Sequence, residues 1–488
     1  MTARQRVLVA GGGVAGIASA LALAQLGVQV TLVETRKKLG GRATSFTDVR
    51  TGEHLDNCQH VVLGCCTNYL DFLRRLGSLD KLTWTREQYW IERGGRTSII
   101  RPSFLPAPTH FSLSVLAARF LSIREKLALA RAMNAILRAD RSRWTNKAFA
   151  DFLASVGQPP RLIRVFWAPV VISACNLPCE RCCASSALQV FQEGFIANAH
   201  AADVGVSRVP LVELYDRAES IISAAGGSIR LGASIQSLTP RSITLSTGEV
   251  LNADKVISTL PAERLREVVS DELIASDPRL SVTTRVAHSP ILGVHMRFDR
   301  PILSTPHAVL VDANVQWLFR KDDEGKSIHA VISAADDWLP LTEEQVAQRV
   351  LSDLHAHIPS SAQAKLEWVR PVKEKRATFA LTPDFEPLRP GVMPQNPEGL
   401  ILAGDWVQSG WPATMEGAVR TGYAAAAAAL SRPAGELVVR DMPPSRLCRL
   451  LGLRSVPSPL LKDSPADHTP PAHRTSIAQI PTTPVLTS

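Results

Sequence analysis

Apolar and polar positions near the start of the chain follow a strand–helix–strand pattern. Residues 6–10 (RVLVA) form a short apolar run, and residues 28–33 (VQVTLV) form a second one. Both runs are typical of buried strands. Between them, Val14 to Leu26 have the Ala- and Leu-rich composition of a helix, with Gly27 placed to end it. The chain is therefore predicted to open with a βαβ unit of an α/β lobe.

Strand-like patterns return much later in the chain. We expect strands in residues 226–231, 241–250 and 254–260, with a turn at Gly248, and in residues 399–404. An Ala-rich helix is predicted from Met415 to Leu430. The α/β lobe is thus expected to be discontinuous, and its predicted segments are residues 1–62, 200–290 and 395–435.

The remaining segments predict a second lobe that mixes helices and sheet. Apolar residues at spacings of three and four predict one long helix over residues 112–138, and residues 291–298 and 328–334 read as strands. This lobe is assigned to residues 63–199 and 291–394. Residues 436–488 are rich in proline and lack apolar periodicity, so we expect a disordered tail there.

Length and composition support two globular lobes. The chain has 488 residues, more than one hydrophobic core usually serves, and 45% of them are hydrophobic. The formal net charge of +9 favours contact with an anionic membrane surface or acidic ligands, with a mildly basic solvated surface as the alternative. No concentrated Lys/Arg tract is present, so we do not expect nucleic acid as a partner.

The eight cysteines do not form the dense pattern of a secreted disulfide scaffold, so reduced thiols in a cytoplasmic protein are expected. Four of them fall between Cys175 and Cys183, including Cys179-x-x-Cys182. Structural zinc usually requires two such pairs separated by a longer loop, so we interpret these cysteines as buried small apolar residues and expect no metal. Asn176 and Pro178 indicate a helix start after Cys175.

A glycine-rich turn follows the first strand. Gly11, Gly13 and Gly16 fit G-x-G-x-x-G, with Val14 and Ala15 inside the motif. The first glycine permits the tight turn, the second lets a pyrophosphate approach the backbone, and the third lets helix and strand pack closely. The helix N-terminus attracts phosphate, and Glu34 at the end of the second strand is placed to accept hydrogen bonds from a ribose. These features predict a dinucleotide site.

Further motifs favour FAD over a nicotinamide dinucleotide. Gly40-Gly41-Arg42 follows the second strand, where glycines allow close passage beside a cofactor and the arginine can neutralise phosphate. Gly404-Asp405 ends the last predicted strand, and Asp405 can bind a ribityl hydroxyl. Thr414-Met415 opens the last helix, whose N-terminus can face the flavin pyrimidine edge.

This combination of motifs resembles the FAD-dependent amine oxidase and phytoene desaturase superfamily, whose fold is of the glutathione-reductase-2 type. Residues 56–76 and 404–423 are more similar still to the squalene-associated hydroxysqualene dehydroxylase family. The resemblance implies that reduced FAD converts hydroxysqualene to squalene in hopanoid synthesis, through hydride transfer to an allylic cation. It also implies FAD contacts at Ala15, Glu34, Arg42, Ile235, Asp405 and Met415.

The resemblance implies a long isoprenoid alcohol as the substrate, and it does not specify the electron donor. Apart from the glycine-interrupted opening segment, no stretch reaches the ~18 uncharged apolar residues of a membrane span, so any membrane contact is expected to be peripheral. The substrate hydroxyl must leave protonated. Asp56 and His60 are the candidate proton donors, with delivery through water as the alternative. Gln59 and Trp411 are candidates for substrate contact, although a backbone-bonded histidine at His60 and ordinary packing of Trp411 stay open.

One position departs from the family pattern. The family usually has glycine where this chain has Cys58, and a cysteine would be strained there if the backbone φ were positive. Two other functions are compatible with the same motifs. The first is carotenoid desaturation on the same fold, and the second is a non-catalytic isoprenoid carrier.

Overall fold

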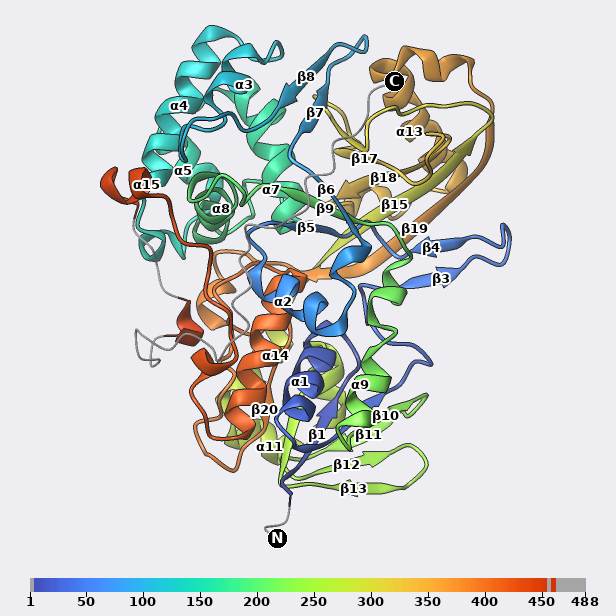
Figure 1. The fold of residues 1–488 in the computed structure, drawn as a ribbon, viewed down its shortest axis with the longest axis vertical. Coiled ribbons are helices and arrows are strands. Elements are labelled where there is room, and N and C mark those ends of the chain that lie inside the picture. Colours follow the sequence, from blue (N-terminus) through green and yellow to red (C-terminus); the bar gives the residue numbers. More distant parts are fainter. Residues whose placement is uncertain (1–3, 454–457, 462–488) are drawn as a thin grey trace.

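The first lobe is built on a five-stranded parallel sheet, at the lower end of the molecule in Figure 1. The computed structural model describes residues 4–453 and 458–461. The strand order is β10-β2-β1-β14-β20. These strands are β1 (Arg6–Ala10), β2 (Gln29–Glu34), β10 (Ser228–Leu231), β14 (Lys255–Ser258) and β20 (Ile401–Leu402). All four pairings are parallel, so three distant parts of the chain meet in one sheet, as the sequence predicted.

Two helices rich in small residues pack together beside this sheet. Helix α1 (Val14–Gln25) is buried from Val14 to Ala24, and α14 (Met415–Ala429) is buried from Glu416 to its end. A Cβ added at Gly422 would lie 2.5 Å from the Ala15 carbonyl oxygen, so the helices meet backbone to backbone. The hydroxyl of Ser19 donates to the Gly422 carbonyl at 2.9 Å and links them. Glycine and alanine in both helices therefore bring the two ends of the chain into contact.

A small antiparallel sheet extends the first lobe. It contains β11 (Ile235–Leu238), β12 (Ser242–Leu245) and β13 (Val250–Asn252), joined in sequence order. Gly248 lies in the predicted turn between β12 and β13 with φ of +87°.

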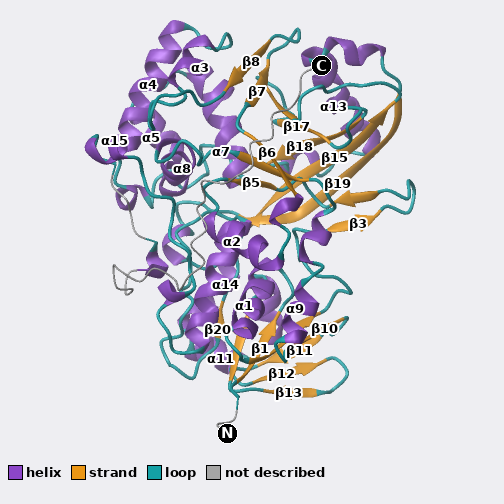
Figure 2. Cartoon of the chain, in the orientation of Figure 1, coloured by secondary structure: helices purple, strands orange, loops and turns teal. Residues whose placement is uncertain are grey.

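The second lobe has a seven-stranded sheet on one side and a group of helices on the other, as Figure 2 shows. Its long strands are β15 (His288–Phe298), β18 (Ser327–Ser333) and β19 (Leu366–Phe379), and β18 and β15 match the predicted strands. Helix α13 (Glu343–His357) covers one face of the sheet, where Leu292, Leu318 and Ile332 form a core with Val350. The remaining strands of this sheet are β7 (Gln88–Ile91), β8 (Thr97–Ile100), β16 (His307–Leu310) and β17 (Trp317–Arg320).

The predicted helix over residues 112–138 is wrong as a single element. The chain instead forms α3 (Ser112–Ala117) and α4 (Ile123–Arg138). Ser122 and Glu125 form a capping box that starts α4, and Phe120 and Leu121 are buried in the connection. The cap overrides the continuous apolar spacing, because it satisfies backbone N–H groups that an uninterrupted helix would satisfy internally.

The prediction of a disordered tail from residue 436 is also wrong for the part that the structure describes. Val438 and Cys448 are buried, and α15 spans Arg446–Leu450. The backbone N–H of Val439 donates to the Asn68 side chain at 2.8 Å, which holds this segment against the start of α2 (Thr67–Leu76). The rest of the predicted tail, residues 454–457 and 462–488, lies outside the described residues. Among the helices in residues 4–453 and 458–461, none is long and apolar enough to cross a bilayer.

Candidate functional site

The glycine-rich turn has the geometry that a bound pyrophosphate requires. Gly11 has φ of +106°, and a Cβ at Gly16 would lie only 1.9 Å from the Gly11 carbonyl oxygen, so α1 starts close against β1. Gly13 precedes α1 without a side-chain cap, and a Cβ added there would meet nothing within 4 Å. The first N–H groups of a helix lack internal partners and carry partial positive charge. Val14 and Ala15 are the first residues of α1, so their backbone N–H groups belong to this helix end.

Glu34 lies at the end of β2 and holds the glycine turn in place. Its Oε2 accepts a hydrogen bond from Gly12 N at 2.6 Å, and its Oε1 accepts one from Arg36 N at 2.7 Å. Each carboxylate oxygen has a second lone pair, so hydrogen bonds from a ribose can be accepted as well. The Glu34 carbonyl accepts from Ala233 N at 2.9 Å, which brings the segment leading to Ile235 beside the end of β2. Ile235 is buried, and its carbonyl accepts a hydrogen bond from Arg264 at 2.6 Å.

The second glycine pair lies directly on the first turn. Gly40 and Gly41 have φ of +101° and +62°, and Gly40 N donates to the Gly12 carbonyl at 2.9 Å. A Cβ at Gly41 would lie 3.0 Å from the Gly13 Cα. Both the backbone conformation and the close approach therefore require glycine.

An ion pair joins the two ends of the chain at this point. Arg42 Nη2 lies 2.5 Å from Asp405 Oδ1, across 363 residues of sequence, and Arg42 Nη1 donates to the Ala377 carbonyl at 3.0 Å. The Thr421 hydroxyl of α14 bonds both the N–H and the carbonyl of Gly404, which places Asp405 at the end of β20. Thr414 caps α14 by accepting from Gly417 N at 3.1 Å, and Met415 begins that helix. The structure thus gathers the predicted cofactor residues from both termini.

A polar cluster near this ion pair contains both predicted proton donors. The Asp56 carboxylate accepts from the Ser45 hydroxyl at 2.7 Å, from Leu211 N at 3.1 Å and from Lys321 Nζ at 3.1 Å. Burial alone would raise the pKa of Asp56, but Lys321 and these hydrogen bonds lower it below its ordinary value. Lys321 Nζ also reaches Gln59 Oε1 at 3.2 Å. Asp56 is therefore an ionised carboxylate at neutral pH and does not suit the predicted role of proton donor.

His60 has a different environment from Asp56. Its Nδ1 bonds the Cys58 carbonyl at 3.0 Å, as the backbone-bonded alternative anticipated. Burial lowers the pKa of His60, so the ring is neutral at pH 7 and its other nitrogen is an acceptor. Like Asp56, His60 does not suit the role of proton donor at neutral pH.

Cys58 is accommodated without the strain considered for it. Cys58 does not belong to the non-glycine residues with positive φ, and its side chain is buried. Burial raises the pKa of its thiol to about 12, so it is a thiol rather than a thiolate at pH 7. It packs in a small apolar cluster with Phe319, Val331, Val61, Val206, Ile291 and Trp317. This cluster lies beside the polar groups Asp56 and His60 in sequence and space.

Trp411 lies in an ordinary packing environment. It is buried against Cys65, Ala201 and Met442, and the Arg420 guanidinium lies 4.8 Å from its ring centroid. The structure therefore favours packing, the alternative to the predicted substrate contact.

Three charged residues hold the elements of the site in place. The sequence alone did not identify them. Arg389 is buried and donates to the carbonyls of Asp405, Trp406, Val407 and Trp411, which fixes the loop after β20. Glu416 accepts from Asn68 N and Tyr69 N, so it caps α2, and it pairs with Arg420 at 2.6 Å. Arg420 and Glu416 are four residues apart in an Ala-rich helix, a spacing that is a sequence signal for an ion pair.

The cysteines of this segment are buried as predicted, but the predicted helix start is wrong. Asn176 is the left-handed C-cap of α7 (Ala168–Cys175), so it ends a helix rather than starting one. Cys182 and Cys183 precede α8 (Ala184–Phe191) and do not lie on a helix. All four cysteines are free and buried. Within the described residues, no group of three or more His, Cys, Asp or Glu side chains is arranged to hold a metal ion.

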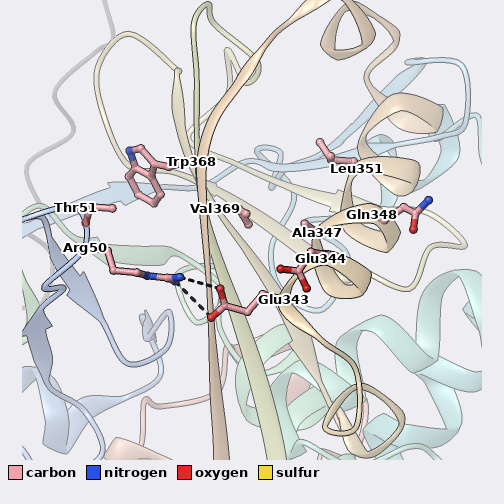
Figure 3. Close-up of a pocket in the computed structure, with 9 residues that line it drawn as sticks. All are labelled: Arg50, Thr51, Glu343, Glu344, Ala347, Gln348, Leu351, Trp368 and Val369. Atoms are coloured by element: carbon pink, nitrogen blue, oxygen red, sulfur yellow. Dashed lines mark hydrogen bonds and ion pairs between the residues drawn. The ribbon is translucent and has the colours of Figure 1, made fainter.

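A surface hollow lies apart from these residues, between the hairpin of β3 (Ser45–Thr47) and β4 (His54–Asp56) and helix α13 (Figure 3). Its volume is about 640 Å³, and Arg50 and Glu343 form an ion pair across it at 3.0 Å. The lining residues are Arg50, Thr51, Glu343, Glu344, Ala347, Gln348, Leu351, Trp368 and Val369. None of the predicted site residues lines it.

Comparison with known proteins agrees with this geometry. A hydroxysqualene dehydroxylase of Zymomonas mobilis subsp. mobilis is 27% identical over 87% of this chain and 98% of its own. A 15-cis-phytoene desaturase of an Oncidium hybrid cultivar is 25% identical over 85% of this chain and 76% of its own. The crystal structure of an oxidoreductase from Methanosarcina mazei has a TM-score of 0.65 at 16% identity, covering 85% of this chain and 98% of that one, and shows the same fold.

The match to a family model covers most of the described chain. The model of flavin containing amine oxidoreductases matches residues 14–430, a range that includes nearly all the site residues described above. Its limits enclose both α1 and α14, the helices that bring the two termini together. The chain therefore belongs to the flavin containing amine oxidoreductase family and is an FAD-dependent oxidoreductase with that α/β fold.

Proposed function

We propose that the protein removes the hydroxyl group of hydroxysqualene reductively and produces squalene. The observation that carries this proposal is the near full-length likeness to hydroxysqualene dehydroxylases. The phytoene desaturases match over a smaller share of their own length. We further propose that this reaction serves hopanoid synthesis on the cytoplasmic side of a membrane.

The proposed cofactor contacts follow from the two joined ends of the chain. The pyrophosphate of FAD would lie in the open space beside Gly13, bounded by Gly11, Gly16, Gly40 and Gly41. Val14 and Ala15 would offer backbone N–H groups to it, and Glu34 would accept hydrogen bonds from the ribose hydroxyls. Ile235 would contact the adenine. Arg42 and Asp405, which form an ion pair, would hold the ribityl region, and Gly404, Thr414 and Met415, around the start of α14, would contact the flavin.

The proposed substrate region combines an apolar surface with a few polar groups, the usual composition of a small-molecule site. The apolar part is the cluster around Cys58, Phe319 and Val331. The polar part is Gln59, His60 and Lys321, which lie beside it. When bound in its reduced form, FAD would supply the hydride that replaces the leaving hydroxyl and would itself be oxidised, while the hydroxyl departs as water.

Loss of the hydroxyl requires a proton or a strong hydrogen-bond donor. Since Asp56 is ionised and His60 is neutral, we propose Lys321 as the group that donates to the departing oxygen. Its ammonium is oriented by Asp56 and Gln59, at 3.1 and 3.2 Å, and one N–H remains available for a substrate. Asp56 then acts as the fixed negative charge that holds Lys321 in place.

Carotenoid desaturation is the second candidate, because phytoene desaturases are also among the relatives. It would use the same apolar surface with the flavin running in the oxidising direction. The flavin family assignment does not favour the third alternative, a non-catalytic carrier.

A paired assay tests the proposal. The purified, flavin-loaded protein would be reduced anaerobically and given hydroxysqualene in detergent, while the oxidised protein is given phytoene. We expect squalene in the first assay and no dehydrogenated product in the second. If the protein instead forms a dehydrogenated carotenoid and no squalene, it is a carotenoid desaturase and the proposal is wrong.

A further inference from the structure

One end of the second lobe exposes an unusual concentration of large apolar side chains. Residues 99–127 contain six of the exposed large hydrophobic residues of the described chain. Phe104, Ile123 and Leu127 are 89%, 66% and 60% exposed. The six residues are Ile99, Phe104, Leu113, Leu116, Ile123 and Leu127, which we call the apolar face. Exposed apolar side chains that gather on neighbouring elements indicate an interaction site.

The local structure holds these side chains outward on neighbouring elements. The loop after β8 is closed by Ser103, whose N–H and hydroxyl both donate to the His110 carbonyl, and Phe104 lies within this closed loop. Helix α3 buries none of its residues, and Leu113 and Leu116 are one turn apart on it. Lys126 of α4 donates to the Leu116 carbonyl at 2.6 Å, which places the first turns of α4 beside the end of α3.

Buried aromatic side chains support the elements that carry the apolar face. Phe120 is buried between α3 and α4 and stacks on Trp90 of β7, with ring centroids 5.1 Å apart. Phe166 stacks on the same Trp90 at 5.7 Å. In Figure 1, α3 and α4 lie at the end of the molecule opposite to the N-terminus, so nothing of the first lobe covers them.

Basic residues outnumber acidic ones in the segment that carries the apolar face. Arg119, Arg124 and Arg131 are exposed and form no ion pair with a described carboxylate. The only acidic residue between positions 99 and 138 is Glu125. It is buried and engaged by Ser122 and Arg161, so it does not offset the arginines at the surface.

We propose that the apolar face, with Arg119, Arg124 and Arg131, docks on an anionic lipid bilayer. Apolar side chains enter the boundary of headgroups and acyl chains, and the arginines contact lipid phosphates, as in helices that lie in the plane of a membrane. An acidic protein partner would also match the positive charge. It would not explain why the apolar side chains of Phe104 and Ile123 are exposed. The biological purpose of the contact rests on the proposed function, because a C30 isoprenoid resides in the bilayer.

Vesicle sedimentation of the full-length, flavin-loaded protein tests the docking surface. The probe is a vesicle of phosphatidylglycerol and phosphatidylethanolamine, compared with one of phosphatidylcholine alone. We expect the wild type to sediment with the anionic vesicles and to be released by salt. The combined variant Phe104→Ser, Ile123→Ser, Leu127→Ser should lower partitioning by about tenfold or more.

Two further variants control this result. The combination Val49→Ser, Val250→Ser, Met393→Ser removes exposed apolar side chains elsewhere and should leave partitioning unchanged. The combination Arg119→Gln, Arg124→Gln, Arg131→Gln should remove the preference for phosphatidylglycerol. All substituted side chains are exposed, and an unchanged flavin spectrum and melting temperature would show that each variant folds. Equal partitioning of the apolar-face variant and the wild type, or no sedimentation of the wild type, would overturn the proposal.

Activity separates this inference from the proposed reaction. The apolar-face variant should convert substrate in detergent as fast as the wild type but more slowly when the substrate is embedded in vesicles. If the wild type produces no squalene in detergent yet binds vesicles through the apolar face, the reaction assignment fails and the docking surface stands.

Discussion

At the scale of residues, the site depends on a few positions where only one side-chain type is compatible with the geometry. Gly16 and Gly41 allow backbone contacts that any Cβ would block. Asp56 and Lys321 depend instead on each other. Lys321 keeps Asp56 ionised, and Asp56 orients the Lys321 ammonium. The glycines were visible in the sequence as a motif. The pairing of Asp56 with Lys321 was not, because 265 residues separate them.

Gly13 tests the cofactor position. Gly13→Trp should abolish flavin binding, because the indole would occupy the open space that we assign to the pyrophosphate. The flavin-to-protein ratio of the purified variant, measured by absorbance, should fall from near one to near zero. Gly391→Trp is the matched control, since a Cβ at Gly391 also meets nothing within 4 Å. A Gly13→Trp protein that retains a full complement of flavin would contradict the assignment.

Substitution of Lys321 tests its proposed role as the proton donor. Lys321→Met should lower kcat by about 100-fold, the scale typical of a lost general acid, while flavin content stays the same. Lys321→Arg keeps the charge beside Asp56 and should fold normally, which separates chemistry from stability. Lys326→Met removes a lysine paired with Glu324 and should have no effect. A kcat for Lys321→Met within twofold of the wild type would remove Lys321 from the mechanism.

At the scale of elements, helix α14 organises the site from one side. Its N-terminal region carries Thr414 as cap, Glu416 as the cap of α2 and Arg420 as partner of Glu416 and Asp441. The side chains of Glu416 and Arg420 are completely buried. The segment after residue 436, expected to be disordered, belongs to the same arrangement through Asp441 and Val439.

Removal of one charge from this buried pair should destabilise the protein. Glu416→Gln leaves Arg420 buried with one carboxylate fewer and should lower the free energy of unfolding by about 3 kcal/mol, as other broken buried pairs do. Urea denaturation measures the change. Glu249→Gln, which breaks an exposed pair with Arg230, should leave the unfolding midpoint unchanged. Equal midpoints for both variants would show that the buried pair contributes little.

At the scale of the whole molecule, neutral histidines are buried in the second lobe and couple its stability to pH. Burial lowers the pKa of His295 and of His307 to about 4. In the unfolded chain these rings titrate near pH 6.5. Between these two values the unfolded state binds more protons than the folded state, so stability is present above pH 6.5 and is lost as the pH falls toward 4.

The free energy of unfolding should therefore decrease between pH 6.5 and pH 4. Each of these histidines should contribute a loss of about 3 kcal/mol at the acid end. His307 lies among Tyr89, Trp317 and Phe319, so His307→Phe fits the same aromatic environment and should flatten the profile. Denaturant titrations at several pH values measure it, with exposed His355 replaced by Gln as the control. Parallel profiles for His307→Phe and the wild type would contradict the linkage.

Features that depend mainly on neighbouring residues could be predicted from the sequence. The βαβ opening, the glycine turns and the position of Glu34 at the end of β2 were predicted correctly, because strand and helix patterns and the backbone conformation of glycine are local properties. The motifs near both termini also identified FAD, because each motif suits a different part of that cofactor.

The contacts between distant groups could not be predicted and are set by tertiary packing. It paired Arg42 with Asp405, placed Lys321 on Asp56, and covered Trp411 with Arg420. It also divided the helix predicted over residues 112–138 and packed residues 437–453 against the molecule. Such contacts depend on the free energy of the whole packed structure. The spacing of apolar residues along a single segment does not determine that free energy.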